Sequence, residues 1–328
     1  MSQENQSLSD YKYIFGPVRS GRLGLSLGLD LLGERICTFD CLYCEVGKTR
    51  IHTLKRDSYV SAEAILQELD RWLKENRPHP DYITLGGMGE PCLNKDLGKI
   101  IAGARELAPN IPTAILTNSS LLGSKRVRRD ISLCQVILPS LDSLVQKEFM
   151  TLNRPCVKLK AEKIAQNLLK LREEYSGQIF LEILLVRGIN DTDENLARLK
   201  DFVQSLRPDR VDVVTMTRPG AYARSLPVPR ETLDKWRKAL KAKETAGQEI
   251  HIQEKDIASA LDYHLIEQKI TNSLKRRPQS VSQLAWALAL PLDEVQKTLK
   301  SLLRKNKATV VATQDQEDFF ALTEASSQ

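Results

Sequence analysis

The sequence predicts an α/β protein that combines a partial (β/α)6 TIM-like barrel with a small C-terminal winged-helix-like α+β domain. Short apolar strands alternate with amphipathic helices over residues 21–250, and strand–helix units repeated in this way favour a mainly parallel sheet with helices outside it. We count about six such units, fewer than the eight of a complete barrel. An open barrel is therefore expected, with a doubly wound open sheet as the alternative. Over residues 251–328 the pattern changes to short helices followed by two strands.

The expected strands of the barrel are short and mostly apolar. They lie at residues 22–29, 81–85, 113–117, 135–138, 179–186 and 210–216. The first helix, at residues 61–76, places Ile65, Leu69 and Leu73 on one side at helical spacing, which is typical of a helix that packs on a sheet. Further helices are expected at residues 95–107, 122–129, 144–152, 157–175, 194–206 and 231–242. Residues 1–20 are expected to form an irregular lead-in.

The C-terminal domain, residues 251–328, is expected to hold three helices and a β-hairpin. The helices lie at residues 257–274, 280–288 and 291–303, and the strands at residues 308–312 and 318–322. Ser280 is placed to cap the second helix, and Pro278 interrupts the chain just before it. Helices followed by a small hairpin resemble a winged helix.

Composition and charge limit the class of protein. The 328 residues contain 41% hydrophobic and 27% charged side chains, which is ordinary for a globular protein. The polar N-terminus lacks a signal-peptide pattern, and no apolar run reaches the roughly 18–20 residues that span a bilayer. We therefore expect a cytoplasmic protein with no membrane contact, in which clustered cysteines serve as metal ligands or catalytic groups. The net charge of +6 is compatible with an anionic partner and equally with none.

Three of the six cysteines, Cys37, Cys41 and Cys44, fall within eight residues. A loop this short supplies three ligands and no local fourth, which is wrong for a closed structural zinc site. It suits a cubane iron–sulfur cluster in which three irons bind the protein and one stays open to another ligand. A zinc-binding or purely structural module is the alternative.

Polar or glycine-rich segments follow three of the predicted strands. The segment Gly-Gly-Met-Gly-Glu-Pro at residues 86–91 follows the strand at 81–85, Asn118 follows the strand at 113–117, and Ser140 follows the strand at 135–138. Loops at the carboxyl ends of barrel strands carry the chemistry of such enzymes. We therefore expect these segments to converge with the cysteine loop. A tight strand–helix turn at 86–91 and helix caps at Asn118 and Ser140 are the alternatives.

The cysteine spacing, the glycine-rich segment and the later loops together resemble the signature of the radical S-adenosylmethionine (SAM) superfamily over roughly residues 20–245. The resemblance implies a [4Fe–4S] cluster on Cys37, Cys41 and Cys44, with SAM bound at the open iron. It further implies contacts to SAM from the residues that match the family motifs: Tyr43 against the adenine, Gly86, Gly87 and Glu90 at the amino group, and Asn118 and Ser140 at the ribose and carboxylate.

Three further runs of sequence look closest to the bacterial iron–sulfur oxidoreductases related to the tRNA wyosine-synthesis enzymes. They are residues 16–28, the triplet Asn153-Arg154-Pro155, and residues 188–191. The wyosine enzymes carry further cysteines upstream of the signature, whereas this sequence has none before Cys37. That difference argues against wyosine chemistry and pyruvate condensation.

The function implied is a radical SAM enzyme that forms a 5′-deoxyadenosyl radical and abstracts hydrogen from an unidentified substrate, with RNA favoured. The alternatives are an enzyme that modifies or activates a protein partner, and a redox-sensing, nucleic-acid-binding regulator. A reductase or flavodoxin-type protein is implied as electron donor. Basic runs at residues 125–129, 275–277 and 304–307 are candidate phosphate contacts, with ordinary solvated faces as the alternative. Arg218 is a candidate anchor for an acidic substrate. Cys92 is a candidate hydrogen-atom donor or thiol near the substrate, with an ordinary small residue in a turn as the alternative.

Overall fold

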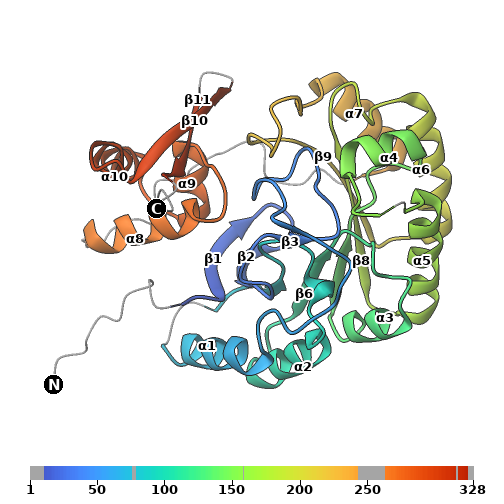
Figure 1. Cartoon of the computed structure of the whole chain (residues 1–328), viewed down its shortest axis with the longest axis horizontal. Helices are drawn as coiled ribbons and strands as arrows, with labels where there is room; N and C mark the ends of the chain where they lie inside the picture. Colours follow the sequence, from blue (N-terminus) through green and yellow to red (C-terminus); the bar gives the residue numbers. More distant parts are fainter. Residues whose placement is uncertain (1–10, 76–78, 158, 243–262, 315–316, 324–328) are drawn as a thin grey trace.

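The computed structural model describes residues 11–75, 79–157, 159–242, 263–314 and 317–323. Its main feature is one seven-stranded sheet that curls into a half-barrel with helices on its outer face (Figure 1). In the order of the sheet, the strands are β1 (Ile14–Ser20), β2 (Gly24–Leu29), β5 (Tyr82–Leu85), β6 (Thr113–Thr117), β7 (Val136–Pro139), β8 (Gln178–Leu185) and β9 (Arg210–Thr215). The strand order follows the chain without reversal, which confirms the partial barrel over the doubly wound alternative.

Six of these strands, β2 and β5 to β9, run parallel, as the repeated units predict. The expected lead-in at residues 1–20 is wrong in its second half. Ile14–Ser20 forms β1, which pairs antiparallel with β2 at the edge of the sheet, and residues 1–10 lie outside the described part of the chain. The sequence pattern missed β1 because Gly16 and Pro17 sit inside it, where a β-bulge shifts the register.

Helices cover the convex face of the half-barrel. They are α1 (Ala62–Lys74), α2 (Leu97–Leu107), α3 (Lys125–Ile131), α4 (Gln146–Asn153), α5 (Ala161–Glu174), α6 (Asp193–Leu206) and α7 (Arg230–Leu240). The strands alternate accordingly. On β8, Ile179, Leu181 and Ile183 are fully buried against this layer, whereas Phe180 and Glu182 face the inside and are half-buried.

The turn between β1 and β2 fills part of the concave face. Leu23 packs there against Ala114, Val136 and Leu138. Its neighbour Arg22 forms an ion pair with Glu182 on β8, and the carbonyl oxygen of Arg22 accepts a hydrogen bond from Arg210 Nη1 at 3.1 Å. Packed side chains therefore occupy the inside of the half-barrel near the amino ends of its strands.

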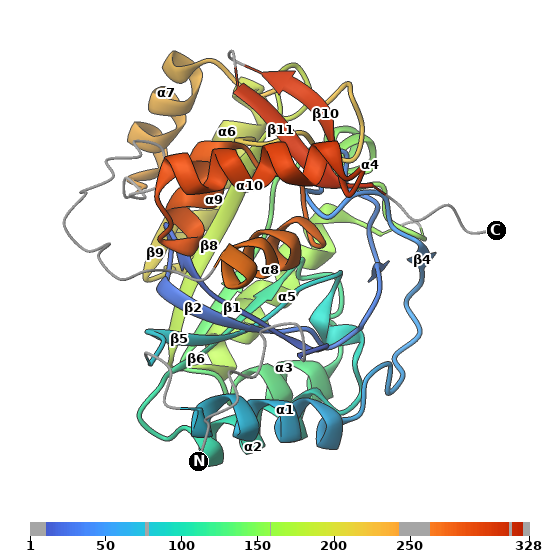
Figure 2. The same ribbon diagram turned by 90° about the vertical axis from the view of Figure 1, so that its left-hand side faces the viewer.

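The C-terminal unit has a core of its own and lies beside β1. It consists of α8 (Tyr263–Leu274), α9 (Val281–Leu288), α10 (Leu292–Arg304) and the antiparallel pair β10 (Ala308–Gln314) and β11 (Glu317–Leu322). Both α8 and α9 contact β1, and Figure 2 shows α8 and α10 in front of β1 and β2. The element order is the predicted one, while residues 257–262 and the boundary expected near residue 250 lie outside the described residues. Among the described residues, no helix is long and apolar enough to span a bilayer.

Candidate functional site

The cysteine loop crosses the carboxyl ends of the barrel strands and is fastened by its backbone. It begins at β3 (Ile36–Cys37), a two-residue strand that pairs with β4 (Ile51–His52). Ile36 also forms a bridge to Gly89. Further along, the backbone N–H of Asp40 donates to the carbonyl of Asn153 at 3.1 Å, and the N–H of Leu42 donates to that of Leu152 at 2.9 Å. The end of α4 therefore fixes the path of the loop between the cysteines.

The three thiols of the loop share one half-buried environment. Burial raises the pKa of Cys37 to about 12 and that of Cys44 to about 11. It also holds the pKa of Cys41 well above its usual value, and the nearby charges of Cys37 and Cys44 add to the rise. Among the described residues, no three His, Cys, Asp or Glu groups lie close enough together to bind a single metal ion, and the cysteines are no exception.

Two side-chain amides point at two of these sulfurs. Asn118 Nδ2 lies 3.5 Å from Cys37 Sγ and 2.9 Å from Thr38 Oγ1. Asn153 Nδ2 lies 3.5 Å from Cys41 Sγ and 2.8 Å from Asp142 Oδ2. Amide donors of this kind stabilise thiolates and thiolate-bound metal groups. The donor set therefore fits an iron–sulfur cluster: three thiols, no local fourth ligand, and N–H groups directed at the sulfurs.

Asn153 was not singled out individually from the sequence, although its triplet formed part of the family resemblance. Its spacing from the cysteines, 112 residues from Cys41, gives no local signal. Only the docking of the end of α4 on the loop brings the two together.

The glycine-rich segment packs tightly against the start of the cysteine loop and against Asp30. Gly89 has a φ of +154°, and a Cβ there would lie 1.8 Å from the carbonyl oxygen of Ile36. Gly87 has a φ of +136°, and its Cβ would lie 3.0 Å from the carboxyl group of Asp30. At Gly86 a Cβ would meet only Leu116 Cβ, at an ordinary 3.8 Å. Packing within the protein therefore requires glycine at Gly87 and Gly89, and does not require it at Gly86.

Glu90 is almost fully buried and ties this segment to the next loop. Its Oε2 accepts a hydrogen bond from the backbone N–H of Asn118 at 2.7 Å. Its Oε1 accepts from Thr117 Oγ1 at 2.7 Å and from the N–H of Cys92 at 3.1 Å. Burial raises the pKa of Glu90, while these donors lower it. The carboxyl group thus aligns the loops after β5 and β6 through three protein hydrogen bonds. Cys92, the candidate substrate thiol, is buried, with its sulfur 3.6 Å from Thr117 Oγ1.

Tyr43 and Ser140 occupy the same end of the barrel. The Tyr43 hydroxyl donates to Asp142 Oδ2 at 2.6 Å, and Asp142 Oδ1 accepts from the backbone N–H of Leu184 at 2.9 Å. Ser140 takes part through its backbone. Its N–H donates to the Thr117 carbonyl at 2.8 Å, and its carbonyl accepts from Ser119 Oγ at 3.0 Å. Hydrogen bonds therefore link Tyr43 to the loop after β7, and Ser140 to the loop that carries Asn118.

The segment after β9 covers the outer side of the cysteine loop. The Tyr222 hydroxyl donates to Asp40 Oδ2 at 2.5 Å, and the Tyr222 N–H donates to the Leu42 carbonyl at 3.1 Å. The cations of Lys48 and Arg154 both lie over the Tyr222 ring, at 5.0 and 4.3 Å from its centre. Sequence reasoning missed Tyr222, because its distance from the cysteines along the chain hides this contact.

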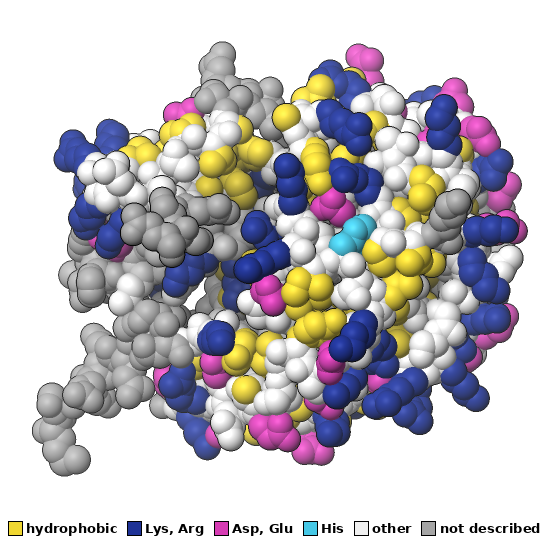
Figure 3. Space-filling view, viewed as in Figure 1, with side chains coloured by type: hydrophobic (Ala, Val, Ile, Leu, Met, Phe, Trp, Pro, Cys, Tyr) yellow, Lys and Arg dark blue, Asp and Glu magenta, His cyan; other side chains and the backbone are white. Residues whose placement is uncertain are grey.

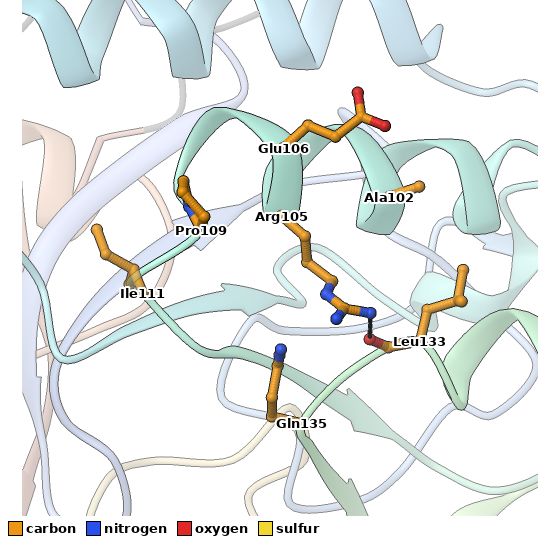
Figure 4. Close-up of a pocket in the computed structure, with 7 residues that line it drawn as sticks. All are labelled: Ala102, Arg105, Glu106, Pro109, Ile111, Leu133 and Gln135. Carbon is orange, nitrogen blue, oxygen red and sulfur yellow. Dashed lines mark hydrogen bonds between the residues drawn. The ribbon is translucent and has the colours of Figure 1, made fainter.

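A surface pocket of about 340 Å³ lies at the opposite end of the half-barrel. Its walls come from α2 and from the segments that precede β6 and β7, and it is lined by Ala102, Arg105, Glu106, Pro109, Ile111, Leu133 and Gln135. Figure 4 shows Arg105 reaching across it to the carbonyl of Leu133, at 2.9 Å. Because it lies at the amino ends of the strands, this pocket is separate from the cysteine loop.

Comparison with known proteins assigns the family and the fold. The family model described as the radical SAM superfamily matches residues 34–199. A crystal structure of a radical SAM methyltransferase from Sphaerobacter thermophilus is similar over 66% of this chain and 63% of that chain. Its TM-score is 0.51 and its sequence identity 17%, so it supports the fold alone.

Two relatives are more similar in sequence. A protein named GTPase Obg from Brachyspira hyodysenteriae is 33% identical over 297 residues, which make up 90% of this chain and 43% of that protein. A UPF0026 protein from Methanocaldococcus jannaschii is 34% identical over 206 residues, 62% of this chain and 64% of that protein. The chain thus spans less than two thirds of either relative. The matched family model covers half of the chain, including all three cysteines: the chain belongs to the radical SAM superfamily, whose cofactors are a [4Fe–4S] cluster and SAM.

Proposed function

We propose that Cys37, Cys41 and Cys44 hold the [4Fe–4S] cluster and that SAM binds beside it at the carboxyl ends of β5, β6 and β7. The observation that carries the proposal is the pair of amides, on Asn118 and Asn153, directed at the sulfurs of Cys37 and Cys41 at 3.5 Å. When bound and reduced, the cluster would supply the electron for reductive cleavage of SAM. The protein would orient the two cofactors relative to each other.

The residues proposed to contact SAM fall into two groups. Gly86 and Gly87 present backbone next to the loop, while Tyr43 offers a half-buried aromatic ring for the adenine. Asn118 and Ser140 stand at the following two strand ends. Glu90, proposed to face the SAM amino group, already accepts three hydrogen bonds from the protein. A carboxylate has about four acceptor positions, and these hydrogen bonds occupy three of them. Glu90 therefore supplies charge while it also aligns the neighbouring loops.

We propose an anionic substrate, with RNA favoured over a protein partner. Four cations in the loops at or near the cysteine end are exposed: Lys48, Arg50, Arg187 and Arg224. Figure 3 shows Lys and Arg side chains spread over this face, including the margin next to the C-terminal unit. The net charge of +6 has the same sign, and such a field attracts polyanions. The resemblance to the tRNA wyosine-synthesis enzymes supports the same substrate class.

The basic runs expected to contact phosphates are mostly engaged within the protein. Arg128 lies buried in the run at residues 125–129 and forms a two-pronged pair with Glu174 at 2.8 and 2.9 Å. Arg276 and Arg277 pair with acidic side chains of the barrel. Lys305 and Lys307 both pair with Glu267. These runs therefore support the RNA proposal less than the exposed cations of the barrel loops.

The proposed cluster site is tested by anaerobic reconstitution with iron and sulfide, followed by dithionite and SAM. We expect the wild-type chain to form 5′-deoxyadenosine and the Cys41→Ala variant to form none above background. Equal amounts from both proteins would exclude the proposed cluster ligands. If the wild-type chain formed no 5′-deoxyadenosine above the Cys41→Ala control, the enzyme interpretation would fail, and binding of nucleic acid by the chain would then favour the redox-sensing regulator.

The substrate class is tested by comparing modified nucleosides in total RNA from cells with and without the gene. A nucleoside that disappears with the gene, and returns with the wild-type chain but not with Cys41→Ala, is the expected result. An unchanged nucleoside profile would transfer the proposal to a protein substrate.

A further inference from the structure

The cysteine loop is held by the C-terminal unit as well as by the barrel. Glu45 directly follows Cys44, and its Oε2 accepts from Arg218 Nη1 at 2.8 Å and from Arg277 Nη1 at 3.0 Å. Arg218 follows β9 in the barrel, whereas Arg277 lies between α8 and α9 of the C-terminal unit. One carboxylate next to a proposed cluster ligand thus joins the two parts of the molecule.

Gln283 fixes the geometry of this junction. Its Oε1 accepts from Arg218 Nε at 2.8 Å, and its Nε2 donates to the carbonyl of Thr217 at 2.7 Å. Gln283 stands in the first turn of α9, where the Ser280 side chain caps the helix in a capping box. The Gln283 side chain therefore binds the start of α9 to the segment after β9. It also orients Arg218, whose Nε contacts Gln283 while its Nη1 contacts Glu45.

The preceding residue, Arg276, reaches a second loop of the site. Its Nη1 lies 3.3 Å from Asp30 Oδ2, and its guanidinium carbon lies 3.9 Å from the centre of the Phe15 ring. Asp30 is buried, accepts from the backbone N–H groups of Leu32 and Gly33, and packs against Gly87 of the glycine-rich segment. Two adjacent arginines of the C-terminal unit therefore bind two different loops, one on each side of the proposed cofactor site. Arg276 binds the loop that carries Asp30, and Arg277 binds the cysteine loop through Glu45.

We infer that the C-terminal unit is a positioning element of the cluster site, and that Arg277, acting through Glu45, holds Cys44 in the geometry in which it binds iron. This inference rests on the proposed assignment of the three cysteines. Arg276 and Arg277, which the sequence made candidate phosphate contacts, accordingly bind acidic side chains of the barrel. Residues outside the ligands themselves commonly control metal affinity in this way, with losses of about 10–100-fold on substitution.

The test uses the full chain, reconstituted anaerobically, in the Arg277→Gln variant. The matched control is Arg304→Gln, which removes an exposed arginine of the same unit, on α10, with no ion pair in the described part of the chain. We expect Arg277→Gln to release iron to a chelator about 10-fold faster than the wild type and to change the electron paramagnetic resonance spectrum of the reduced cluster. Arg304→Gln is expected to match the wild type in both measurements.

A second variant separates loss of positioning from misfolding. Glu45→Gln leaves every residue of the C-terminal unit in place, and it should release iron at least as fast as Arg277→Gln, because it also weakens the contact with Arg218. The double variant should be no worse than Glu45→Gln alone, because the change at Glu45 already removes the ion pair with Arg277. Circular dichroism of the cluster-free proteins checks that each variant folds.

The outcomes also distinguish the inference from the proposed function. Wild-type iron release and an unchanged spectrum in both Arg277→Gln and Glu45→Gln would overturn the inference and leave the proposed cluster site intact. A Cys41→Ala chain that bound iron and sulfide like the wild type would overturn the proposed site itself.

Discussion

At the scale of single residues, the site depends on polar groups that meet the cysteines from distant parts of the chain. Asn118 follows β6 and Asn153 ends α4, yet their amides lie within 3.5 Å of Cys37 Sγ and Cys41 Sγ. An N–H group directed at a thiolate stabilises the more negative, reduced form of a bound cluster. The two asparagines are therefore expected to raise the reduction potential.

Asn118→Ala should lower the midpoint potential of the reconstituted cluster. A hydrogen bond contributes about 0.5–1.5 kcal/mol, which for a one-electron couple corresponds to about 20–60 mV. Asn118→Asp, which replaces the donor by a negative oxygen of the same size, should lower the potential further. A redox titration followed by electron paramagnetic resonance measures both. Potentials equal to that of the wild type in the two variants would contradict a hydrogen bond to the cluster.

Tyr43 combines a ring proposed to face the adenine with a hydroxyl bound to Asp142 at 2.6 Å. Tyr43→Phe removes only the hydroxyl, so the buried carboxyl group loses one of its donors, and the unfolding free energy of the cluster-free protein should fall by about 1–3 kcal/mol. Urea unfolding measures this loss.

SAM binding separates the two roles of Tyr43. Tyr43→Phe keeps the ring and should bind SAM like the wild type, whereas Tyr43→Ala should bind it roughly 10-fold more weakly because the stacking contact is lost. Equilibrium dialysis of the reconstituted proteins gives both affinities. Equal losses in the two variants would exclude a stacking role for the ring.

At the scale of elements, the glycine-rich segment is shaped by its contact with the start of the cysteine loop. Gly89 forms a bridge to Ile36, the residue before Cys37. No side chain fits between them, since a Cβ would lie 1.8 Å from the Ile36 carbonyl oxygen. The segment after β5 and the backbone before Cys37, the first proposed cluster ligand, therefore form one unit.

Gly89→Ala should separate the segment after β5 from the start of the cysteine loop. The added Cβ collides with backbone and the residue must keep an unfavourable φ, a strain of about 1–3 kcal/mol before the collision is counted. We expect a clear fall in thermal stability and loss of bound iron, measured by circular dichroism and iron analysis.

Gly86→Ala is the matched control in the same segment. Its Cβ would meet only Leu116 Cβ at 3.8 Å, so stability should change by less than about 1 kcal/mol. Weaker SAM binding in this folded variant would then report contact with the cofactor. If Gly89→Ala behaved like Gly86→Ala, the backbone contact to Ile36 would not matter for the site.

At the scale of the whole molecule, the half-barrel has two different ends. The turn between β1 and β2 inserts Leu23 and Arg22 among the inward-facing residues, where Leu23 packs on Ala114, Val136 and Leu138. The opposite end carries the cysteine loop, the segment after β9 and the arginines of the C-terminal unit. The proposed chemistry is thereby placed at the carboxyl ends of the strands, where loops can vary without disturbing the sheet.

Leu23→Ala should lower the unfolding free energy by about 2–5 kcal/mol, because the side chain is 5% exposed and its removal leaves a cavity. Leu107→Ala, at a residue 38% exposed at the end of α2, should change it by less than about 0.5 kcal/mol. Urea unfolding of the cluster-free proteins measures both. A Leu23→Ala variant as stable as Leu107→Ala would show that the turn does not pack inside the half-barrel.

The fold was predictable wherever the signal was local. The six parallel strands and their helices follow from apolar runs and helical spacing, and β1 was missed because a Gly-Pro pair and a bulge interrupt its pattern. Within the site, the spacing of Cys37, Cys41 and Cys44 pointed to an iron–sulfur cluster. The glycine-rich segment drew attention to Gly86 and Gly87, but the tightest approach is at Gly89, because the distance from Ile36 to Gly89 is a tertiary quantity.

By itself the sequence determined the parallel half-barrel, the three thiols and the strand ends at which polar residues stand, because each depends on neighbours within a few positions along the chain. Only the tertiary structure decided that Asn153 meets Cys41, that Glu90 ties two loops together, and that Arg277 binds Glu45. These contacts join residues tens to hundreds of positions apart. No periodicity encodes them, since they form only when the sheet curls and the C-terminal unit packs against β1.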